Sequence, residues 1–442
     1  MSRLARIALA LLVLVVTSAC AIGRSAPVAS TPVPSRHVLP NGVRIVIEEH
    51  RRSDVVALQL WVQAGGRDES PAELGLAHYL EHLLFKGTTS RPEGFIDRQV
   101  EGVGGRMNAG TSLDYTYYHM LLPARRALAG IETLADISVN ASLDEGQLER
   151  EKRVVLEEMR LGEDNPNRFL LRQLYVAAFD GHPYGRPVIG TVDLIRNLTR
   201  DQLVRFYRRH YVPEAFTLVV VGAVNRAEVL DAAARAFGRL TRSGTSRLPV
   251  GAPADTRAVR LEQARPGAHA YLGLAWLAPK LEHADTPAVD LLVTILGQGR
   301  SPRLVRSLRD RLGLVNSIAA GYSALEAAGV ITLTAQLEPA NLARAEAEIW
   351  RELRRVHDEG VHARELERAR TTEEARREFQ AETAEGRAFV LGHAETVWRL
   401  EEERAYLDRL RAVTPEQIRA AARRYLDLGR YARVVLMPGD RS

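Results

Sequence analysis

Alternating hydrophobic and polar positions predict β-strands in several parts of the chain. The clearest alternation covers residues 43–48, 55–62, 268–277 and 329–337. Long amphipathic helices are predicted where hydrophobic residues recur every three or four positions, for example over residues 341–356. Because strands and helices interleave without a regular β-α-β rhythm, the pattern favours an α+β fold, in which helices pack on one face of a mostly antiparallel sheet.

A helix followed by a strand appears once near the middle of the chain and again at its end. Thr199 begins one predicted helix, which leads into the hydrophobic strand 216–222. Thr414 begins the other helix, and the strand that follows it starts at Tyr431. In both copies Thr is the expected N-cap and an acidic residue lies in the first turn. The repeat indicates two homologous domains.

The joint between these domains is predicted in a stretch rich in Gly, Ser and Pro. We expect an N-terminal domain at residues 36–241, a linker at 242–256 and a C-terminal domain at 257–442. A chain of 442 residues with 46% hydrophobic content is large enough to bury two such cores. Its 60 Lys and Arg residues are intermixed with 55 Asp and Glu residues, so the composition gives little support for nucleic-acid binding.

The first 21 residues have the layout of a secretory signal peptide. Arg3 and Arg6 precede the hydrophobic run 7–16, which is too short to span a bilayer permanently. We expect an exported, periplasmic protein in which residues 22–35, rich in Ser and Pro, form a tether. Cys20 is the only cysteine, so no internal disulfide can form.

Two ways of processing the signal peptide remain open. Residues 17–20 resemble a bacterial lipobox, which would make Cys20 a lipidated first residue anchored to a membrane, although Thr17 stands where that pattern prefers Leu. Residues 19–21 also read as an A-x-A site, with ordinary cleavage after Ala21. The position of the lone cysteine favours lipid attachment.

The most specific chemical motif lies in the run of residues 76–85. His78 and His82 are four residues apart and project from nearly the same face of a helix, with Glu81 beside them. The order H-x-x-E-H is the inverted form of the H-E-x-x-H zinc-protease motif. A catalytic zinc usually takes three protein ligands, so a third ligand is required, and a carboxylate completes one of the common sets.

The expected carboxylate lies in a predicted helix over residues 147–159. Glu151 and Glu158 are two turns apart and share a face, whereas Glu157 points about 100° away from Glu158. One of the shared-face pair is expected to bind the metal, and the other to hold a ligand in place. Taken alone, a solvated charged helix face explains the same residues. Four hydrophobic residues of this helix are expected to face inward: Leu148, Val154, Val155 and Met159.

The segment 78–88, HYLEHLLFKGT, resembles the signature of the pitrilysin (insulinase-like) zinc metallopeptidase family nearly letter for letter. The resemblance is to its short-chain branch, which includes mitochondrial processing peptidase. Residues 151–158 resemble the family's downstream element. The resemblance implies one Zn²⁺ per chain, with His78, His82 and Glu158 as its ligands. It also implies that Glu81 is the general base and that Glu151 supports the ligands.

Two further segments resemble family elements. Residues 104–112 resemble the strand against which these enzymes lay their substrate, which implies substrate contacts at Asn108 and Ala109. Residues 181–190 resemble another family element. In the second half, the stretch that should correspond to the metal helix offers no imidazole and only Asp290 as a carboxylate, so we expect it to hold no zinc.

The second half instead resembles a family segment whose Arg and Tyr, seven residues apart, contact the bound substrate. Arg309 stands at the Arg position, Asn316 stands at the Tyr position, and Tyr322 is out of register. Family members of this length enclose a chamber with four domains, which requires two chains. The missing Tyr implies a heterodimer with a homologous subunit that lacks zinc and supplies the Arg/Tyr pair. A homodimer is the alternative.

These features predict a zinc-dependent endopeptidase that cleaves peptides or unfolded segments inside a chamber formed by two chains. One alternative is a proteolytically silent subunit of the same fold that binds peptides or acts as a scaffold. Another is an unrelated metal-dependent hydrolase, in which Glu158 is not needed for zinc binding.

Overall fold

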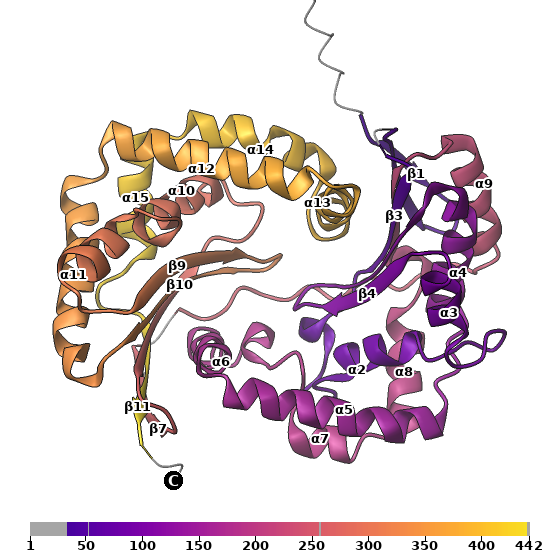
Figure 1. The fold of residues 1–442 in the computed structure, drawn as a ribbon, viewed down its shortest axis with the longest axis horizontal. Coiled ribbons are helices and arrows are strands. Elements are labelled where there is room, and N and C mark those ends of the chain that lie inside the picture. The colour runs from indigo at the N-terminus through magenta and orange to yellow at the C-terminus, as the bar shows by residue number, and fades with distance from the viewer. Residues whose placement is uncertain (1–32, 52, 256–257, 440–442) are drawn as a thin grey trace, which may run out of the picture. The chain divides into compact units, whose positions relative to one another are not determined.

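The computed structural model describes residues 33–51, 53–255 and 258–439. The predicted signal peptide, including Cys20, and most of the predicted tether lie outside these residues. Within the described ranges, no helix is both long and apolar enough to cross a membrane. The chain from Ser35 onward forms one compact unit, and this unit contains two β-sheets (Figure 1).

The first sheet has six strands in the order β1-β2-β6-β3-β5-β4. Strands β2 and β6 are parallel, and the other neighbours are antiparallel. The central strand β3 is buried along almost its whole length, because hydrophobic residues face both sides of the sheet. The strands are β1 (Ser35–Val38), β2 (Arg44–Glu49), β3 (Val55–Val62), β4 (Arg106–Thr111), β5 (Thr116–Pro123) and β6 (Phe216–Gly222).

The second sheet repeats this arrangement with five strands in the order β7-β11-β8-β10-β9. Strands β7 and β11 are parallel, as β2 and β6 are in the first sheet. The two edge strands β4 and β9 therefore occupy equivalent places, and the prediction of an α+β fold with two related halves is confirmed. The strands are β7 (Val259–Arg265), β8 (Ala270–Ala278), β9 (Ser317–Ala324), β10 (Gly329–Leu337) and β11 (Ala432–Pro438).

The helices of each half pack on one face of its own sheet, some of them directly and others on the helices beside the sheet. The first half contributes α2 (Leu76–Leu84), α3 (Phe95–Glu101), α4 (Ala127–Val139), α5 (Glu145–Asp164), α8 (Arg200–His210) and α9 (Arg226–Phe237). The second half contributes α10 (Thr286–Gly297), η5 (Val305–Arg311), α11 (Leu342–Glu359), α12 (Ala363–Ala381), α14 (Leu400–Ala412) and α15 (Pro415–Tyr425). The short helix α7 (Val192–Arg196) contacts α5.

The repeated helices start as the sequence predicts. The side chain of Thr199 caps α8, and the side chain of Gln202 accepts a hydrogen bond from the Thr199 backbone N–H at 2.9 Å. Thr414 and Gln417 form the same capping box at the start of α15, with a distance of 2.8 Å. Strands β6 and β11 follow these helices in the chain. Equivalent caps thus begin equivalent elements in both halves.

The opposite face of each sheet is covered by a helix from the other half. Helix α6 (Pro166–Ala178) buries Leu170 and Leu174 against the second sheet, and α13 (Ala384–Val397) buries Ala388 and Leu391 against the first. Figure 1 shows α6 beside β10 and β11, and α13 beside the first sheet. Because the helices are exchanged, each half covers a sheet face that would otherwise expose hydrophobic side chains.

Two glycines allow the exchanged helices to lie close to their sheets. A Cβ atom on Gly273 of β8 would lie 2.8 Å from Cδ1 of Leu174 in α6. A Cβ atom on Gly392 of α13 would lie 2.0 Å from Nε1 of Trp61 in β3. Both contacts are too short for a real Cβ atom, so a side chain at either position would push a helix away from the sheet that it covers.

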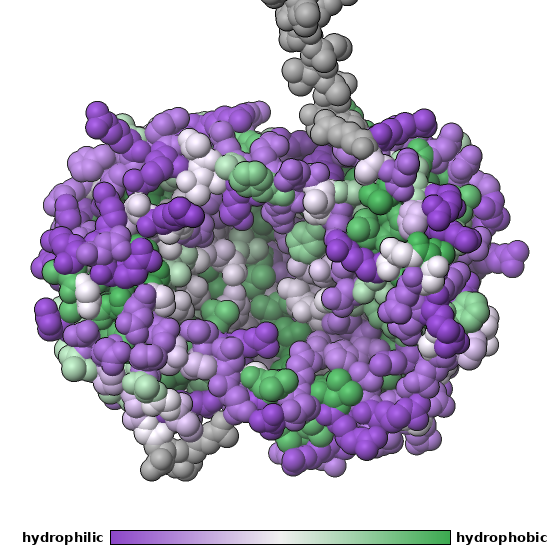
Figure 2. Space-filling view, viewed as in Figure 1, coloured by the Kyte–Doolittle hydropathy of each residue, from purple (hydrophilic) through white to green (hydrophobic). Residues whose placement is uncertain are grey.

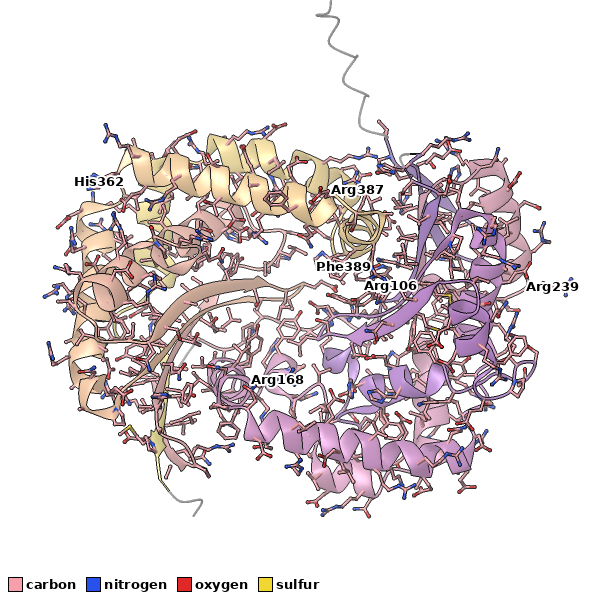
Figure 3. All side chains as sticks on the ribbon, viewed as in Figure 1. Arg106, Arg168, Arg239, His362, Arg387 and Phe389 are labelled. Carbon is pink, nitrogen blue, oxygen red and sulfur yellow. The ribbon has the colours of Figure 1, made fainter. Side chains whose placement is uncertain are left out.

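Helix α13 also reaches the edge strand β4. Arg106 at the start of β4 pairs with Glu385 of α13, and Nδ1 of His119 in β5 lies 3.0 Å from the same carboxylate. Figure 3 shows Arg106 next to α13, which carries Arg387 and Phe389. An edge strand of the first half is therefore held partly by a helix of the second half.

We expect the exchange to contribute strongly to stability. Leu174 is fully buried, so Leu174→Ala should lower the free energy of unfolding by about 2–5 kcal/mol. Leu171 lies on the same helix but is 42% exposed, so Leu171→Ala should change it by less than about 0.5 kcal/mol. Urea unfolding followed by circular dichroism measures both values. Equal effects of the two substitutions would contradict the packing of α6.

Candidate metal centre

Helix α2 presents both histidines of the inverted motif on one side. Its hydrophobic residues Leu76, Leu80 and Leu83 are buried in the core of the first half, which fixes the rotation of the helix. His78 and His82 lie one turn apart, with ring centroids separated by 4.7 Å. Both imidazoles are only partly buried, so the side of α2 opposite the core is left for polar chemistry.

Helix α5 brings the carboxylates to this polar side. The helix begins at the N-cap Asp144, whose side chain accepts a hydrogen bond from the backbone N–H of Gln147. The hydroxyl of Tyr79 in α2 donates to the backbone carbonyl of Leu148, which joins the two helices. Glu151 is buried, whereas Glu158 is partly exposed.

The expected inward position of Val154 is wrong, because its side chain is 50% exposed. Leu148, Val155 and Met159 are buried as expected. Successive helical residues are rotated by about 100°, so Val154 points well away from the face that carries Val155.

The structure brings His78, His82 and Glu158 together. One ligand atom from each lies within 4.8 Å of the others. The Oε2 atom of Glu158 is 3.6 Å from Nε2 of His78 and 3.7 Å from Nε2 of His82. These separations are too long for ordinary hydrogen bonds, and ligands of a tetrahedral zinc ion lie roughly 3.3–3.5 Å apart. Two imidazole nitrogens and one carboxylate oxygen suit zinc in type, and the two separations from Glu158 are close to the spacing that zinc requires.

Glu151 orients His82 from behind. Its Oε1 atom lies 2.8 Å from Nδ1 of His82, and its Oε2 atom lies 3.2 Å from Nζ of Lys86. A hydrogen bond at Nδ1 leaves Nε2 of His82 directed at Glu158, which is the arrangement that a metal ligand requires. Burial acts to lower the pKa of His82, but the bond to Glu151 and the neighbouring carboxylates outweigh it and raise that pKa.

His78 has the opposite electrostatic environment. Burial lowers the pKa of His78 to about 4, and the charge of His82 acts in the same direction. Its Nδ1 atom is buried and has no hydrogen-bond partner among the described residues. The imidazole of His78 is therefore held neutral near pH 7, as metal binding requires.

Glu81 lies between this cluster and the edge strand β4. The hydroxyl of Thr111 in β4 donates a hydrogen bond to Oε2 of Glu81 at 2.6 Å. Burial raises the pKa of Glu81 above its usual value and the charge of Glu158 adds to this effect, although Thr111 and His82 act against it. A carboxyl group with a raised pKa next to a metal cluster suits the exchange of a proton near neutral pH.

The predicted substrate strand is β4, at the free edge of the first sheet. Asn108 and Ala109 both lie on it. The backbone N–H of Ala109 is bonded to the side chain of Asn108 at 2.9 Å rather than to another strand. This edge therefore keeps backbone groups that a further strand can pair with.

Arg309 lies on η5 in the second half, where it is exposed and pairs with Asp310 at 2.9 Å. In the described part of the chain, no hydrogen bond or ion pair joins it to the metal cluster. Asn316 is exposed, and its backbone N–H donates to the carbonyl of Gln336. The hydroxyl of Tyr322 donates to the carbonyl of Pro279 at 2.6 Å, so this tyrosine is held within its own half.

Three residues that contribute to the centre were not identified from the sequence: Tyr79, Lys86 and Thr111. Tyr79 and Lys86 lie inside the histidine motif, and Thr111 lies inside the edge-strand motif. Motif position alone marks them as candidates, but their roles depend on contacts with residues about 30 to 70 positions away.

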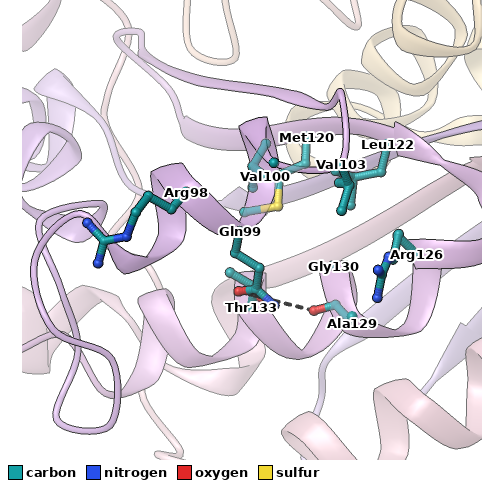
Figure 4. Close-up of a pocket in the computed structure, with 11 residues that line it drawn as sticks. Arg98, Gln99, Val100, Val103, Met120, Leu122, Arg126, Ala129, Gly130 and Thr133 are labelled. Carbon is teal, nitrogen blue, oxygen red and sulfur yellow. Dashed lines mark hydrogen bonds between the residues drawn. The ribbon is translucent and has the colours of Figure 1, made fainter.

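A separate cavity of about 270 Å³ lies between α3, α4 and β5 (Figure 4). It contains none of the cluster residues, so it is not the metal site. Its lining residues are Arg98, Gln99, Val100, Gly102, Val103, Met120, Leu122, Arg126, Ala129, Gly130 and Thr133.

Comparison with known proteins decides the family. Residues 44–192 match the model described as Insulinase (Peptidase family M16), and residues 197–373 match the Peptidase M16 inactive domain. The chain is 32% identical over 404 residues to an uncharacterized zinc protease of Streptomyces coelicolor, covering 88% of this chain and 86% of that protein. The chain belongs to peptidase family M16.

Other M16 relatives agree with this assignment. An uncharacterized zinc protease of Mycobacterium leprae is 32% identical over 414 residues, covering 91% of each protein. A probable mitochondrial-processing peptidase subunit beta of Arabidopsis thaliana is 30% identical over 278 residues, covering 61% of this chain and 51% of that protein. The resemblance seen in the sequence motifs is confirmed at the level of the family.

Solved structures share the fold. A protease from Helicobacter pylori matches with a TM-score of 0.87 at 24% identity, covering 92% of this chain and all of that chain. An M16 inactive domain from Pseudomonas fluorescens matches with a TM-score of 0.85 at 20% identity, covering 92% of this chain and 99% of that chain. The two-sheet architecture is thus shared by solved structures that have little sequence identity to this chain.

The geometry predicts how three neighbouring glutamates differ in metal binding. Glu158→Gln should weaken zinc binding by more than about 100-fold, because it removes a charged ligand. Glu151→Gln should weaken it by about 10- to 100-fold through the orientation of His82. Glu157 is bonded to Arg160 on the exposed side of α5, so Glu157→Gln is the matched control and should leave affinity unchanged. Competition with a chelator measures all three affinities.

The two histidines also predict how zinc binding depends on pH. A proton competes with the metal at His82, whose pKa is raised, but not at His78, whose pKa is about 4. As pH falls through the pKa of His82, affinity should fall with a slope of about one proton per ion. Chelator competition between about pH 5.5 and 8 tests this expectation. A slope near two would mean that both histidines become protonated in this range.

Proposed function

We propose that this M16 protein is a zinc-dependent endopeptidase that cleaves peptides or unfolded segments inside a chamber formed by two chains. The observation that carries the proposal is the convergence of His78, His82 and Glu158 next to Glu81. A metal-ligand set of suitable spacing with an adjacent carboxyl group is the minimum apparatus for metal-assisted hydrolysis of an amide.

In the proposed mechanism, His78, His82 and Glu158 would hold zinc, and Glu81 would accept and then release the proton. When bound, zinc supplies a Lewis acid that activates water and polarises the peptide carbonyl. The carboxylate of Glu81 takes the proton from the attacking water and later gives it to the leaving amine. Thr111 holds one oxygen of this carboxylate, which keeps the group between the cluster and the substrate strand. The raised pKa of Glu81 favours holding the proton between the two steps.

The edge strand β4 is the proposed substrate platform. A substrate in extended conformation would add to the sheet at Asn108 and Ala109, where its backbone replaces the bond between the Ala109 N–H and the Asn108 side chain. Backbone pairing makes little demand on substrate sequence, whereas it requires an extended chain. Figure 2 shows a hollow in the face of the molecule that is turned toward the viewer. The surface inside the hollow is hydrophobic or weakly polar, and the surface around it is hydrophilic.

A second chain completes the proposed chamber. The Arabidopsis relative is named as a subunit, which supports an assembly of more than one chain. We favour a heterodimer in which a homologous subunit without zinc supplies an Arg/Tyr pair. Asn316 has no hydroxyl to replace the missing tyrosine, and the hydroxyl of Tyr322 is already bonded to Pro279. Arg309 remains the proposed substrate contact of this chain, and a homodimer is the alternative assembly.

The proposed location is the periplasm. Residues 1–21 support this because they have the layout of a signal peptide. Two alternatives are proposed for the processing of this segment, namely lipid attachment at Cys20 and cleavage after Ala21. Lipid attachment would tie the enzyme to a membrane surface through residues 22–35.

A proteolytically silent peptide-binding subunit is the second candidate function. It is favoured by the match of residues 197–373 to a domain described as inactive. That match covers residues 197–373, which do not include the histidine pair, whereas residues 44–192, which carry all three candidate ligands, match the Insulinase model. The ligand set therefore favours the peptidase.

Glu81→Gln tests the proposed chemistry. We expect it to lower kcat by at least about 100-fold while zinc stays bound, because it removes the proton acceptor but no ligand. Purified protein is assayed with fluorogenic peptides, alone and together with a homologous subunit, and its zinc content is measured. Glu157→Gln is the control and should keep full activity. Wild-type protein that binds zinc but cleaves no peptide in either assay would favour the silent subunit.

A further inference from the structure

The N-terminus of the metal helix α2 is capped by a carboxylate from outside the helix. Gly75 occupies the N-cap position and has no side chain to accept a hydrogen bond. Glu69 takes this role instead: its two oxygens accept the backbone N–H groups of Gly75 and Ala77 at 2.9 and 2.8 Å. Glu69 is only 2% exposed. Burial raises the pKa of Glu69 to about 8, although its hydrogen bonds to the Ala77 and Gly75 backbone act against this shift, so the cap rests on the two hydrogen bonds rather than on a full charge.

The same end of α2 rests on the chain segment 181–190, for which the chemistry above provides no role. Gly75 has a φ of 95°, and a Cβ atom there would lie 2.8 Å from the carbonyl oxygen of Ile189 and 2.9 Å from Cα of Gly190. Arg186 from this segment donates to the backbone carbonyl of Glu69 at 2.7 Å. The close backbone contact and the cap therefore fix the start of α2 together.

The two residues before Glu69 belong to a charge cluster that joins both halves and the linker. Arg247 of the linker makes two hydrogen bonds to Asp68, at 2.6 and 2.8 Å, and one to Glu326 of the second half at 2.8 Å. The side chain of Arg67 is 2% exposed and lies 3.2 Å from Glu326 and 3.4 Å from Asp114. Two guanidinium groups thus neutralise most of the charge of three carboxylates.

This cluster also holds the turn at the end of the edge strand β4. The backbone N–H groups of Gly66 and Arg67 donate to the carbonyls of Ser112 and Leu113, at 3.0 and 2.9 Å. Thr111, which holds Glu81, directly precedes this turn. Residues 66–69 are therefore bonded to the start of the metal helix, to the end of the substrate strand and to the other half of the chain.

We propose that residues 67–69 position the metal centre from the junction of the two halves. In this role the Glu69 carboxylate caps α2, while Arg67 and Asp68 tie its loop to Arg247 and Glu326. The inference rests on the proposed peptidase function. Glu69, Arg67 and Asp68 are positioning residues, since none of them contacts the metal cluster. Displacement of catalytic groups by about 1 Å can lower the rate by about 100-fold. Residues that fix the start of α2 are therefore expected to affect kcat.

Glu69→Ala tests the cap. We expect kcat to fall by about tenfold or more, with KM changed by less than about threefold, because β4 keeps its free edge while the catalytic groups shift. The absorption spectrum of the Co²⁺-substituted protein should also change. Glu69→Gln keeps one acceptor oxygen and should restore part of both signals. Glu373, a 1% exposed carboxylate bonded to Thr294 in the second half, is the matched control. Glu373→Gln should leave kcat and the Co²⁺ spectrum unchanged, because this carboxylate lies in the second half and is bonded to Thr294.

The junction is tested separately with Arg247→Ala, which should lower kcat by about tenfold at unchanged zinc content. Arg242→Ala is its control. Arg242 lies in the same linker, but its side chain is 67% exposed and makes a longer contact, at 3.5 Å, with Glu214. Unchanged kcat in both Glu69→Ala and Arg247→Ala would overturn the proposal. Unchanged kcat in Arg247→Ala alone would also overturn it, since the junction would then not act on the centre.

Failure of the proposed function gives a different result. If wild-type protein cleaves no peptide, amide hydrogen exchange in residues 76–84 still reports on the cap in the metal-free protein. Glu69→Ala should speed this exchange relative to the rest of the first half. Faster exchange without peptidase activity would support the positioning role of Glu69 and contradict the proposed peptidase function. Unchanged exchange would contradict the positioning role itself.

Discussion

Burial of one side of α2 is the constraint on which the metal centre depends. The leucines of this helix fill the core of the first half, so the histidines must point away from that core. Tyr79 then fixes the distance to α5 through its bond to Leu148. With these contacts in place, Glu151 and Glu158 lie on the face of α5 that is turned toward the two imidazoles. The energy that holds a polar site in place thus comes mainly from apolar packing on the opposite side of the same helix.

The exchange of α6 and α13 makes the two halves depend on each other. Each sheet has a hydrophobic face that its own half leaves uncovered, and the helix that covers it comes from the other half. The exchanged helix α13 also pairs with the start of the edge strand through Glu385. The charge cluster around Arg67 and Arg247 adds a polar contact between the same parts. Both ends of β4 are therefore in contact with residues that join the two halves.

The two halves share a topology but differ in chemistry at equivalent places. Helix α10 contacts the edge strand β9 as α2 contacts β4. Where α2 has a polar side with two histidines, α10 is buried almost all around, and burial raises the pKa of its Asp290 to about 6. The hydroxyl of Tyr406 donates to this carboxyl group. The second half has thus filled with core packing the space that the first half uses for metal ligands.

The sequence by itself determined the secondary structure around the centre, the pairing of the histidines on one face and the shared face of Glu151 and Glu158. These features follow from the helical repeat, which acts over a few residues. The residue pattern left open which glutamate meets the metal, and the family resemblance pointed to Glu158. Only the tertiary structure placed Glu158 at the Nε2 atoms and Glu151 behind His82. It also placed Val154 in solvent, brought Thr111 to Glu81 and exchanged the two covering helices, because such contacts depend on how distant elements pack.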